Sequence, residues 1–168
     1  MLRAVERAIV VSFCAALAAA GIVRGQDVGQ IPADASPREV EIYQSTDPAV
    51  VTFRSVCVKC HTPDRVLTVR RTGAEWEETI AKMLTKGASG TDDELQTIFY
   101  YLVGTFGKVH INSAGAEEIA AVLGLSPDTS AALVRVRGQR GAFRTMSDLG
   151  HVRGVDPAKV SADAVVFD

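Results

Sequence analysis

The chain has 168 residues and a formal net charge of −2 at pH 7. That length accommodates one ordinary domain or two very small ones. The near-neutral charge argues against a protein that coats nucleic acid by bulk electrostatic attraction, because such domains carry a strong basic excess.

The N-terminus has the pattern of a targeting segment. Arg3 and Arg7 provide positive charge, an apolar run covers residues 8–23, and small residues lie at its end. This pattern predicts a signal peptide over residues 1–25 and an exported, periplasmic mature protein. The run is shorter than the roughly 20 residues that span a bilayer. We therefore expect no integral membrane span after cleavage, with an uncleaved N-terminal anchor as the alternative.

The next segment, residues 26–46, is rich in Pro, Asp, Gly and Ser and predicts a linker or a wrapping segment. A helix is expected from Asp47, which can cap it while Pro48 occupies the first turn. Thr72 and Thr91 each stand three residues before a glutamate and predict the capping boxes of two further helices. Their apolar stripes are Trp76, Ile80, Met83 and Leu84 in the first, and Leu95, Ile98, Phe99 and Leu102 in the second.

After a break at residues 108–115, the chain predicts about four short helical stretches separated by Gly-containing turns. We expect them at residues 116–123, 128–138 and 146–152, and from Ala158 onward. They form a loose repeat of helix, turn and helix, and no strand system is expected. The predicted fold is all-α, with one small unit over residues 47–107 and a second over 108–168.

Residues 57–61 read Cys-Val-Lys-Cys-His. Removal of Cys14 with the signal peptide leaves Cys57 and Cys60 as the cysteines of the mature chain. The two thiols of this motif add to the two vinyl groups of a porphyrin, and the adjacent His61 becomes the proximal axial ligand of the iron. The motif predicts one covalently bound haem c. The alternatives are a disulfide or a two-thiol redox site. A zinc site is disfavoured because no second pair of ligands has fitting spacing.

Residues 47–107 resemble a monohaem class I cytochrome c domain. The resemblance lies in the Cys-x-x-Cys-His motif, Pro63-Asp64-Arg65, the Trp76 helix that continues into residues 83–88, and a closing helix that ends Phe-Tyr-Tyr-Leu at 99–102. It implies a methionine as second axial ligand and an electron-transfer role. Met83 is the expected distal ligand, although a Met at helical spacing also suits core packing.

Other residues remain possible as the sixth ligand. Met146 is the second methionine of the mature chain, His110 and His151 are reserves, and a five-coordinate iron is a further alternative. Three arginines are candidates to pair with the haem propionates or to form a solvated surface: Arg65, Arg70 and Arg71.

The C-terminal unit, from Val109 to about Val160, resembles the helix-hairpin-helix module of the ComEA-like family of periplasmic DNA receptors. The matching stretches are residues 109–114 with Glu117 and Glu118, then 123–125 and 141–143, continued by Leu149, Val152, Gly154 and Val155. In such modules a Gly-apolar-Gly turn exposes backbone amides to a phosphate. Here Ser126 and Asp156 replace the second glycines, whereas Arg135, Arg137, Arg140 and Arg144 cluster nearby. We expect a protein-docking module, with DNA binding as the less favoured use.

The sequence thus predicts a periplasmic monohaem electron carrier, or a subunit of a dehydrogenase, with a redox partner protein in the periplasm. It shows no nucleophile–base–orienter set and no phosphate loop, so an independent enzyme is not expected. The alternatives are a periplasmic DNA-binding or uptake protein with a structural or redox-sensing haem, and a gas or redox sensor with an open iron site.

Overall fold

A computed structural model describes residues 31–168 of the chain. The predicted signal peptide and Cys14 lie outside these residues. The described elements, in chain order, are α1 (Pro37–Gln44), α2 (Pro48–Cys57), α3 (Asp64–Leu67), α4 (Gly73–Thr85), α5 (Asp92–Phe106), β1 (Val109–His110), α6 (Ala116–Leu123), α7 (Pro127–Arg140), α8 (Met146–Gly150), the 3-10 turn η1 (Ala162–Ala164) and β2 (Val165–Val166). The predominance of helices agrees with the predicted all-α class.

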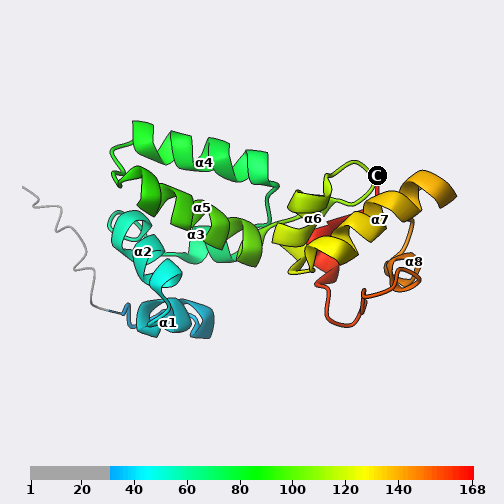
Figure 1. Ribbon diagram of the computed structural model, residues 1–168. Helices are drawn as coiled ribbons and strands as arrows, with labels where there is room; N and C mark the ends of the chain where they lie inside the picture. Colours follow the sequence, from blue (N-terminus) through cyan, green and yellow to red (C-terminus); the bar gives the residue numbers. More distant parts are fainter. Residues whose placement is uncertain (1–30) are drawn as a thin grey trace, which may run out of the picture.

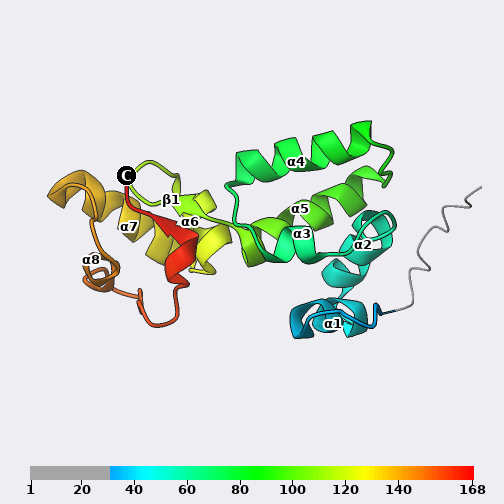
Figure 2. The same ribbon diagram turned by 180° about the vertical axis from the view of Figure 1, so that it is seen from behind.

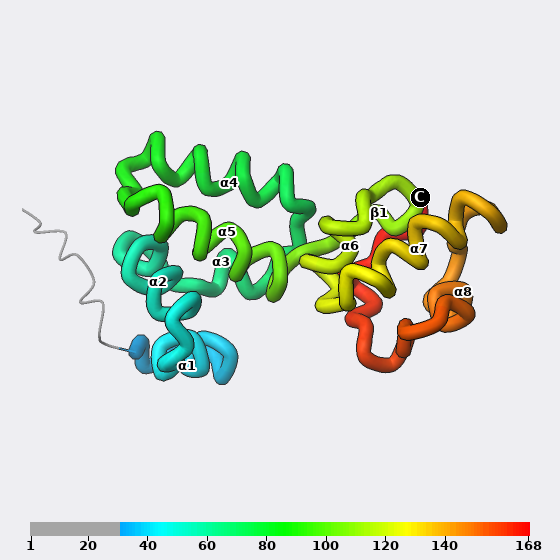
Figure 3. The backbone as a smooth tube through the Cα atoms, in the orientation of Figure 1, coloured from blue at the N-terminus to red at the C-terminus, as the bar shows by residue number. Residues whose placement is uncertain are grey.

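Helices α1 to α5 gather in one part of the molecule and α6 to α8 in the other, as Figures 1 and 2 show from opposite sides. Figure 3 traces α5 directly into the segment that leads to α6. Within residues 31–168, no helix combines the length and apolarity that a membrane span requires.

Helix α1 lies inside the segment that was expected to be a linker. Ser36 and Glu39 form a capping box at its start. Its end is held by Arg54 of α2, whose guanidinium donates to the carbonyls of Ile42 at 2.8 Å and Tyr43 at 2.6 Å. The sequence predicted a linker or a wrapping segment here and did not predict the helix, because tertiary hydrogen bonds stabilise it and it has little apolar periodicity of its own.

The three predicted helix starts of the N-terminal part are confirmed. Asp47 accepts from the Ala49 amide at 2.8 Å at the start of α2. Capping boxes begin α4 at Thr72 and α5 at Thr91. Between α2, α4 and α5 lies an apolar core in which Phe53, Trp76, Ile98 and Leu102 are buried.

The C-terminal part contains two successive hairpins. Helices α6 and α7 form the first, and Gly124 in its turn has a φ of 63°. The second runs from α8 through a turn at Gly154, which packs against Thr129 in the first turn of α7. Their common core includes Ile111, Ile119, Leu133 and Leu149, all fully buried.

One prediction for the C-terminal part was wrong, and one pair of two-residue strands was not predicted. The helix expected from Ala158 is replaced by turns, the 3-10 segment η1 and the short strand β2. Strand β2 pairs in parallel with β1, with Val109 opposite Val165, although no strand was expected. The chain stays extended there because its backbone groups bond to β1 while Val165 is buried.

Candidate functional site

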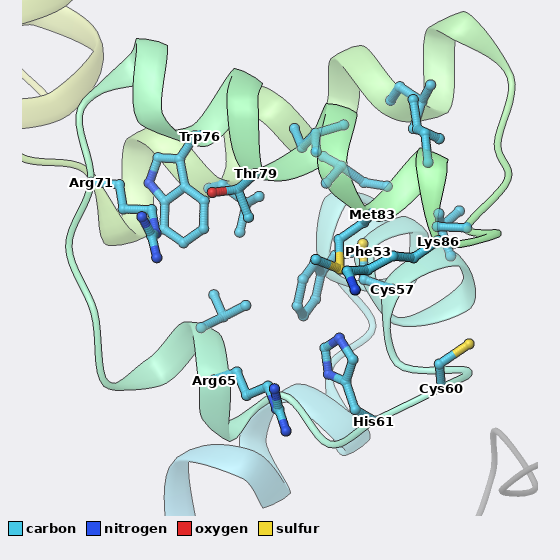
Figure 4. Close-up of a pocket in the computed structure, with 18 residues that line it drawn as sticks. Phe53, Cys57, Cys60, His61, Arg65, Arg71, Trp76, Thr79, Met83 and Lys86 are labelled. Atoms are coloured by element: carbon cyan, nitrogen blue, oxygen red, sulfur yellow. The ribbon is translucent and has the colours of Figure 1, made fainter.

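A cavity of about 550 Å³ lies between α4 on one side and the end of α2 with α3 on the other. This volume is typical of sites that bind a cofactor-sized ligand. Figure 4 shows α4 above the cavity and Cys60, His61 and Arg65 below it. The lining is mainly apolar: Phe53, Val56, Val66, Trp76, Ile80, Met83, Leu84, Ala88, Leu95, Ile98 and Leu102. Its polar members are Cys57, Cys60, His61, Arg65, Arg71, Thr79 and Lys86.

The Cys-x-x-Cys-His segment lies at the end of α2, so that all three of its functional side chains line this cavity. Cys57 is the last residue of α2, and the turn that follows brings Cys60 and His61 round to the same space. Both thiols are free, Cys57 partly buried and Cys60 exposed. The Cys57–Cys60 disulfide, one of the alternatives to haem attachment, is not formed in this structure.

Burial raises the pKa of the Cys57 thiol to about 11. At neutral pH this group is therefore protonated. Redox-active and nucleophilic cysteines have lowered pKa values that populate the thiolate. The environment of Cys57 does not favour a two-thiol redox centre.

The imidazole of His61 is oriented by one hydrogen bond. Its Nδ1 lies 2.8 Å from the carbonyl oxygen of Thr62. Because a carbonyl only accepts, Nδ1 carries the proton and Nε2 retains its lone pair. Metal-binding histidines commonly have this arrangement, in which the non-ligating nitrogen donates to a backbone carbonyl. Figure 4 shows the ring directed toward the cavity.

Met83 comes from α4, across the cavity from His61 (Figure 4). The reserve candidates lie elsewhere. Met146 begins α8, His151 follows α8, and His110 in β1 pairs with Asp168 at 2.5 Å. Of the four side chains considered as sixth ligand, Met83 is the one that lines this cavity.

The three candidate arginines separate into two groups. Arg65 and Arg71 line the cavity. Arg70 instead forms an ion pair with Asp163 at 2.7 Å, and this contact contributes to a lowered pKa of that carboxyl. The guanidinium of Arg71 lies 5.7 Å from the centre of the Trp76 ring. Position along the chain alone did not distinguish these neighbours.

Sequence reasoning missed Thr79 and Lys86, which also line the cavity. A signal was present, since Thr79, Met83 and Lys86 follow the i, i+4, i+7 spacing of one helix face. Their polarity concealed it, because only apolar residues had been assigned to the buried stripe of α4.

The hairpin turns of the C-terminal part bear directly on phosphate binding. The Ser126 hydroxyl accepts from the Thr129 amide at 3.2 Å and so occupies one of the amides at the start of α7. Asp156 in the second turn accepts from the Ala158 amide at 3.1 Å. Arg137 donates to the carbonyls of Ile111 and Ser113. It therefore holds the module together instead of belonging to an open cluster with the other arginines.

Residues 104–163 match the family described as the helix-hairpin-helix motif. The motif is therefore present in the C-terminal part, as the sequence predicted. The match does not extend over the segment from Phe53 to Leu102 that lines the cavity. Neither the curated proteins nor the solved structures give a significant match to the chain.

Proposed function

We propose that the protein is an exported, periplasmic c-type cytochrome with one covalent haem, which transfers electrons to or from a partner protein. The observation that carries this proposal is the convergence of Cys57, Cys60 and His61 on one apolar cavity of about 550 Å³. The two free thiols and the available Nε2 of His61 are the groups that a covalently attached haem requires.

A bound haem supplies reversible one-electron chemistry at its iron. The protein supplies attachment, ligands and environment. Cys57 and Cys60 would provide the two thiols, His61 would provide a nitrogen ligand and Met83 a sulfur ligand; all four line the cavity. The apolar lining excludes water and, together with a Met ligand, favours the ferrous state.

The proposal assigns the helix-hairpin-helix unit to docking on a redox partner, such as a dehydrogenase subunit. Asp156 supports this use, because a carboxylate at the turn of the second hairpin repels phosphate. DNA binding is the second candidate, and the match of residues 104–163 to the helix-hairpin-helix motif favours it. In that case the haem is structural or redox-sensing.

The first test is expression of the full chain alongside a c-type haem maturation system. We expect haem that stays attached after denaturation and a low-spin, six-coordinate spectrum in both oxidation states. The double variant Cys57→Ser/Cys60→Ser should retain no haem. Cys14→Ser, which changes a cysteine of the predicted signal peptide, should load normally.

Absence of attached haem in the native chain would refute the proposal, as would equal loading of the double variant. A high-spin, five-coordinate iron would instead favour the gas or redox sensor.

A further inference from the structure

The two ends of the cavity differ in chemistry. Cys60 lies at one end, and Arg71 with Trp76 lies at the other, next to the start of α4 (Figure 4). The apolar middle separates the thiols from the guanidinium group. Lys86 lies on the side of the thiols, and Arg71 marks the other, cationic end (Figure 4). A ligand attached through Cys57 and Cys60 therefore extends toward Arg71.

The side chain of Arg71 has an unmet hydrogen-bonding requirement. Its Nε is buried and lacks a hydrogen-bond partner among the described residues. The guanidinium packs on the ring of Trp76, which fixes its position without satisfying that donor. A buried donor without an acceptor costs free energy. The most favourable acceptor for a guanidinium is a carboxylate, which can take two parallel N–H bonds.

The backbone of Arg71 connects this end of the cavity to the C-terminal part. Its amide donates to the Phe106 carbonyl at 3.2 Å, and its carbonyl accepts from the Lys108 amide at 2.9 Å. The indole N–H of Trp76 also donates to the Phe106 carbonyl, at 3.2 Å. Residues 106–108 are thus bonded to both residues that form the cationic end.

The side chain of the preceding residue, Arg70, forms hydrogen bonds with the same segment. It donates to the carbonyls of Thr105 and Gly107 at 3.3 and 3.1 Å. It also bonds to Ser161 at 3.3 Å and Asp163 at 2.7 Å, near the end of the C-terminal part. Arg70 therefore has its partners within the protein, whereas Arg71 has a buried donor at the cavity.

We propose that Arg71 binds a carboxylate of the molecule that fills the cavity, and that residues 70–71 transmit this contact to residues 106–108 and 161–166. The inference rests on the proposed function, in which the carboxylate is a haem propionate. Arg70 links the two parts of the molecule through its hydrogen bonds and has no contact with the ligand. Filling of the cavity thereby stabilises the C-terminal docking unit.

The test compares Arg71→Gln with Arg70→Gln in the haem-loaded full chain, because both remove one positive charge at adjacent positions. Arg71→Gln should lower the midpoint potential, since it removes a cation that favours the electron-rich ferrous state. It should also make the potential more dependent on pH near neutrality, because the carboxylate loses the partner that kept its pKa low. Arg70→Gln should keep the native pH profile.

A third variant keeps the test decisive if Arg71→Gln binds haem poorly. Arg71→Lys retains the charge and should recover most of the native potential. Equal potentials and equal pH profiles in the native, Arg71→Gln and Arg71→Lys proteins would overturn the assignment of Arg71.

Hydrogen exchange tests the transmitted contact. In Arg71→Gln, amides at 106–110 and 161–166 should exchange at least ~5-fold faster than in the native holoprotein, the lower end of typical coupling between sites. Exchange within α7 at 127–133 should be unchanged. Unaltered exchange at 106–110 and 161–166 would overturn the coupling. Failure of the native chain to attach haem would refute the proposed function, whereas a loaded protein indifferent to Arg71→Gln would refute this inference alone.

Discussion

At the scale of single residues, one short contact determines the chemistry available at His61. The bond from Nδ1 to the Thr62 carbonyl fixes the tautomer, with the proton on Nδ1. Nε2 then presents a lone pair to a metal ion, whereas the other tautomer would present an N–H group, which cannot bind a metal. The carbonyl belongs to the very next residue, so this orientation arises locally at the end of the Cys-x-x-Cys-His motif.

Met83 lies across the cavity from His61 and is the proposed second ligand of the haem iron, which a substitution can test. In Met83→Ala the sulfur is lost, so we expect conversion from a low-spin to a high-spin spectrum and a lower midpoint potential. Met146→Ala is the matched control, because that methionine begins α8 and does not line the cavity. A Met83→Ala protein with the native spectrum would exclude the sulfur as a ligand and leave Met83 as packing.

At the scale of elements, the close approach of the two hairpins depends on a glycine. Gly154 has a φ of 94°, and a Cβ placed there would lie 2.7 Å from the Thr129 hydroxyl oxygen. Thr129 belongs to α7 of the first hairpin. The turn of the second hairpin can therefore approach the first hairpin because position 154 has no side chain.

Substitution of this glycine should destabilise the C-terminal part. Gly154→Ala combines the cost of positive φ, about 1–3 kcal/mol for a non-glycine residue, with the clash against Thr129. Gly124→Ala is the control, since it has a φ of 63° but nothing within 4 Å of its Cβ. We expect a larger loss of unfolding free energy for Gly154→Ala in urea titrations followed by circular dichroism.

The double variant Gly154→Ala/Thr129→Ala separates the two contributions. It should recover the part of the loss that is due to the clash. Equal losses for Gly154→Ala and Gly124→Ala would mean that the close approach of the two turns is not energetically important.

Helix starts were predictable because their signals are local. Asp47, Thr72 and Thr91 each cap a helix through amides two or three residues away. Helix α1 and strand β2 were missed because their stability comes from distant residues. Arg54 bonds to the end of α1, and Val109 pairs with Val165 across 56 positions.

The candidate site follows the same division. The Cys-x-x-Cys-His motif is recognised by its spacing alone, so its residues were named as candidates from the sequence, and all three line the cavity. The different positions of Arg70 and Arg71 depend on how the segment after α3 lies against residues 105–108 and Asp163. Adjacent residues of an extended segment point to opposite sides. The sequence does not tell which of the two sides faces the cavity, because that depends on the tertiary contacts of the segment.

At the scale of the whole molecule, the arrangement joins a cofactor-sized cavity to a helix-hairpin-helix unit. The connection is both covalent, where α5 runs toward α6, and non-covalent, through the Arg70–Asp163 pair. A partner bound to the helix-hairpin-helix unit would be held at a defined position relative to the cavity. This matters for electron transfer, which requires a reproducible approach of donor and acceptor.

The two candidate uses of that unit predict different responses to salt. If it docks on protein, duplex DNA should be retained weakly and lost at physiological ionic strength. Asp156 places a carboxylate at the second turn, where it bonds to the Ala158 amide and pairs with Lys159 at 3.7 Å, and Arg137 is engaged internally. Asp156→Gly should then strengthen retention, whereas Glu117→Gln, an equal charge change on α6, should have little effect. The affinity for duplex DNA, measured as a function of salt concentration, tests the prediction for the native chain and for both variants.

The contradicting outcome is strong, salt-dependent binding by the native chain. If the log of its DNA-binding constant fell with the log of salt concentration at a slope near −0.9 for each of several phosphates, the docking role would be excluded. The haem would then belong to a DNA-binding protein.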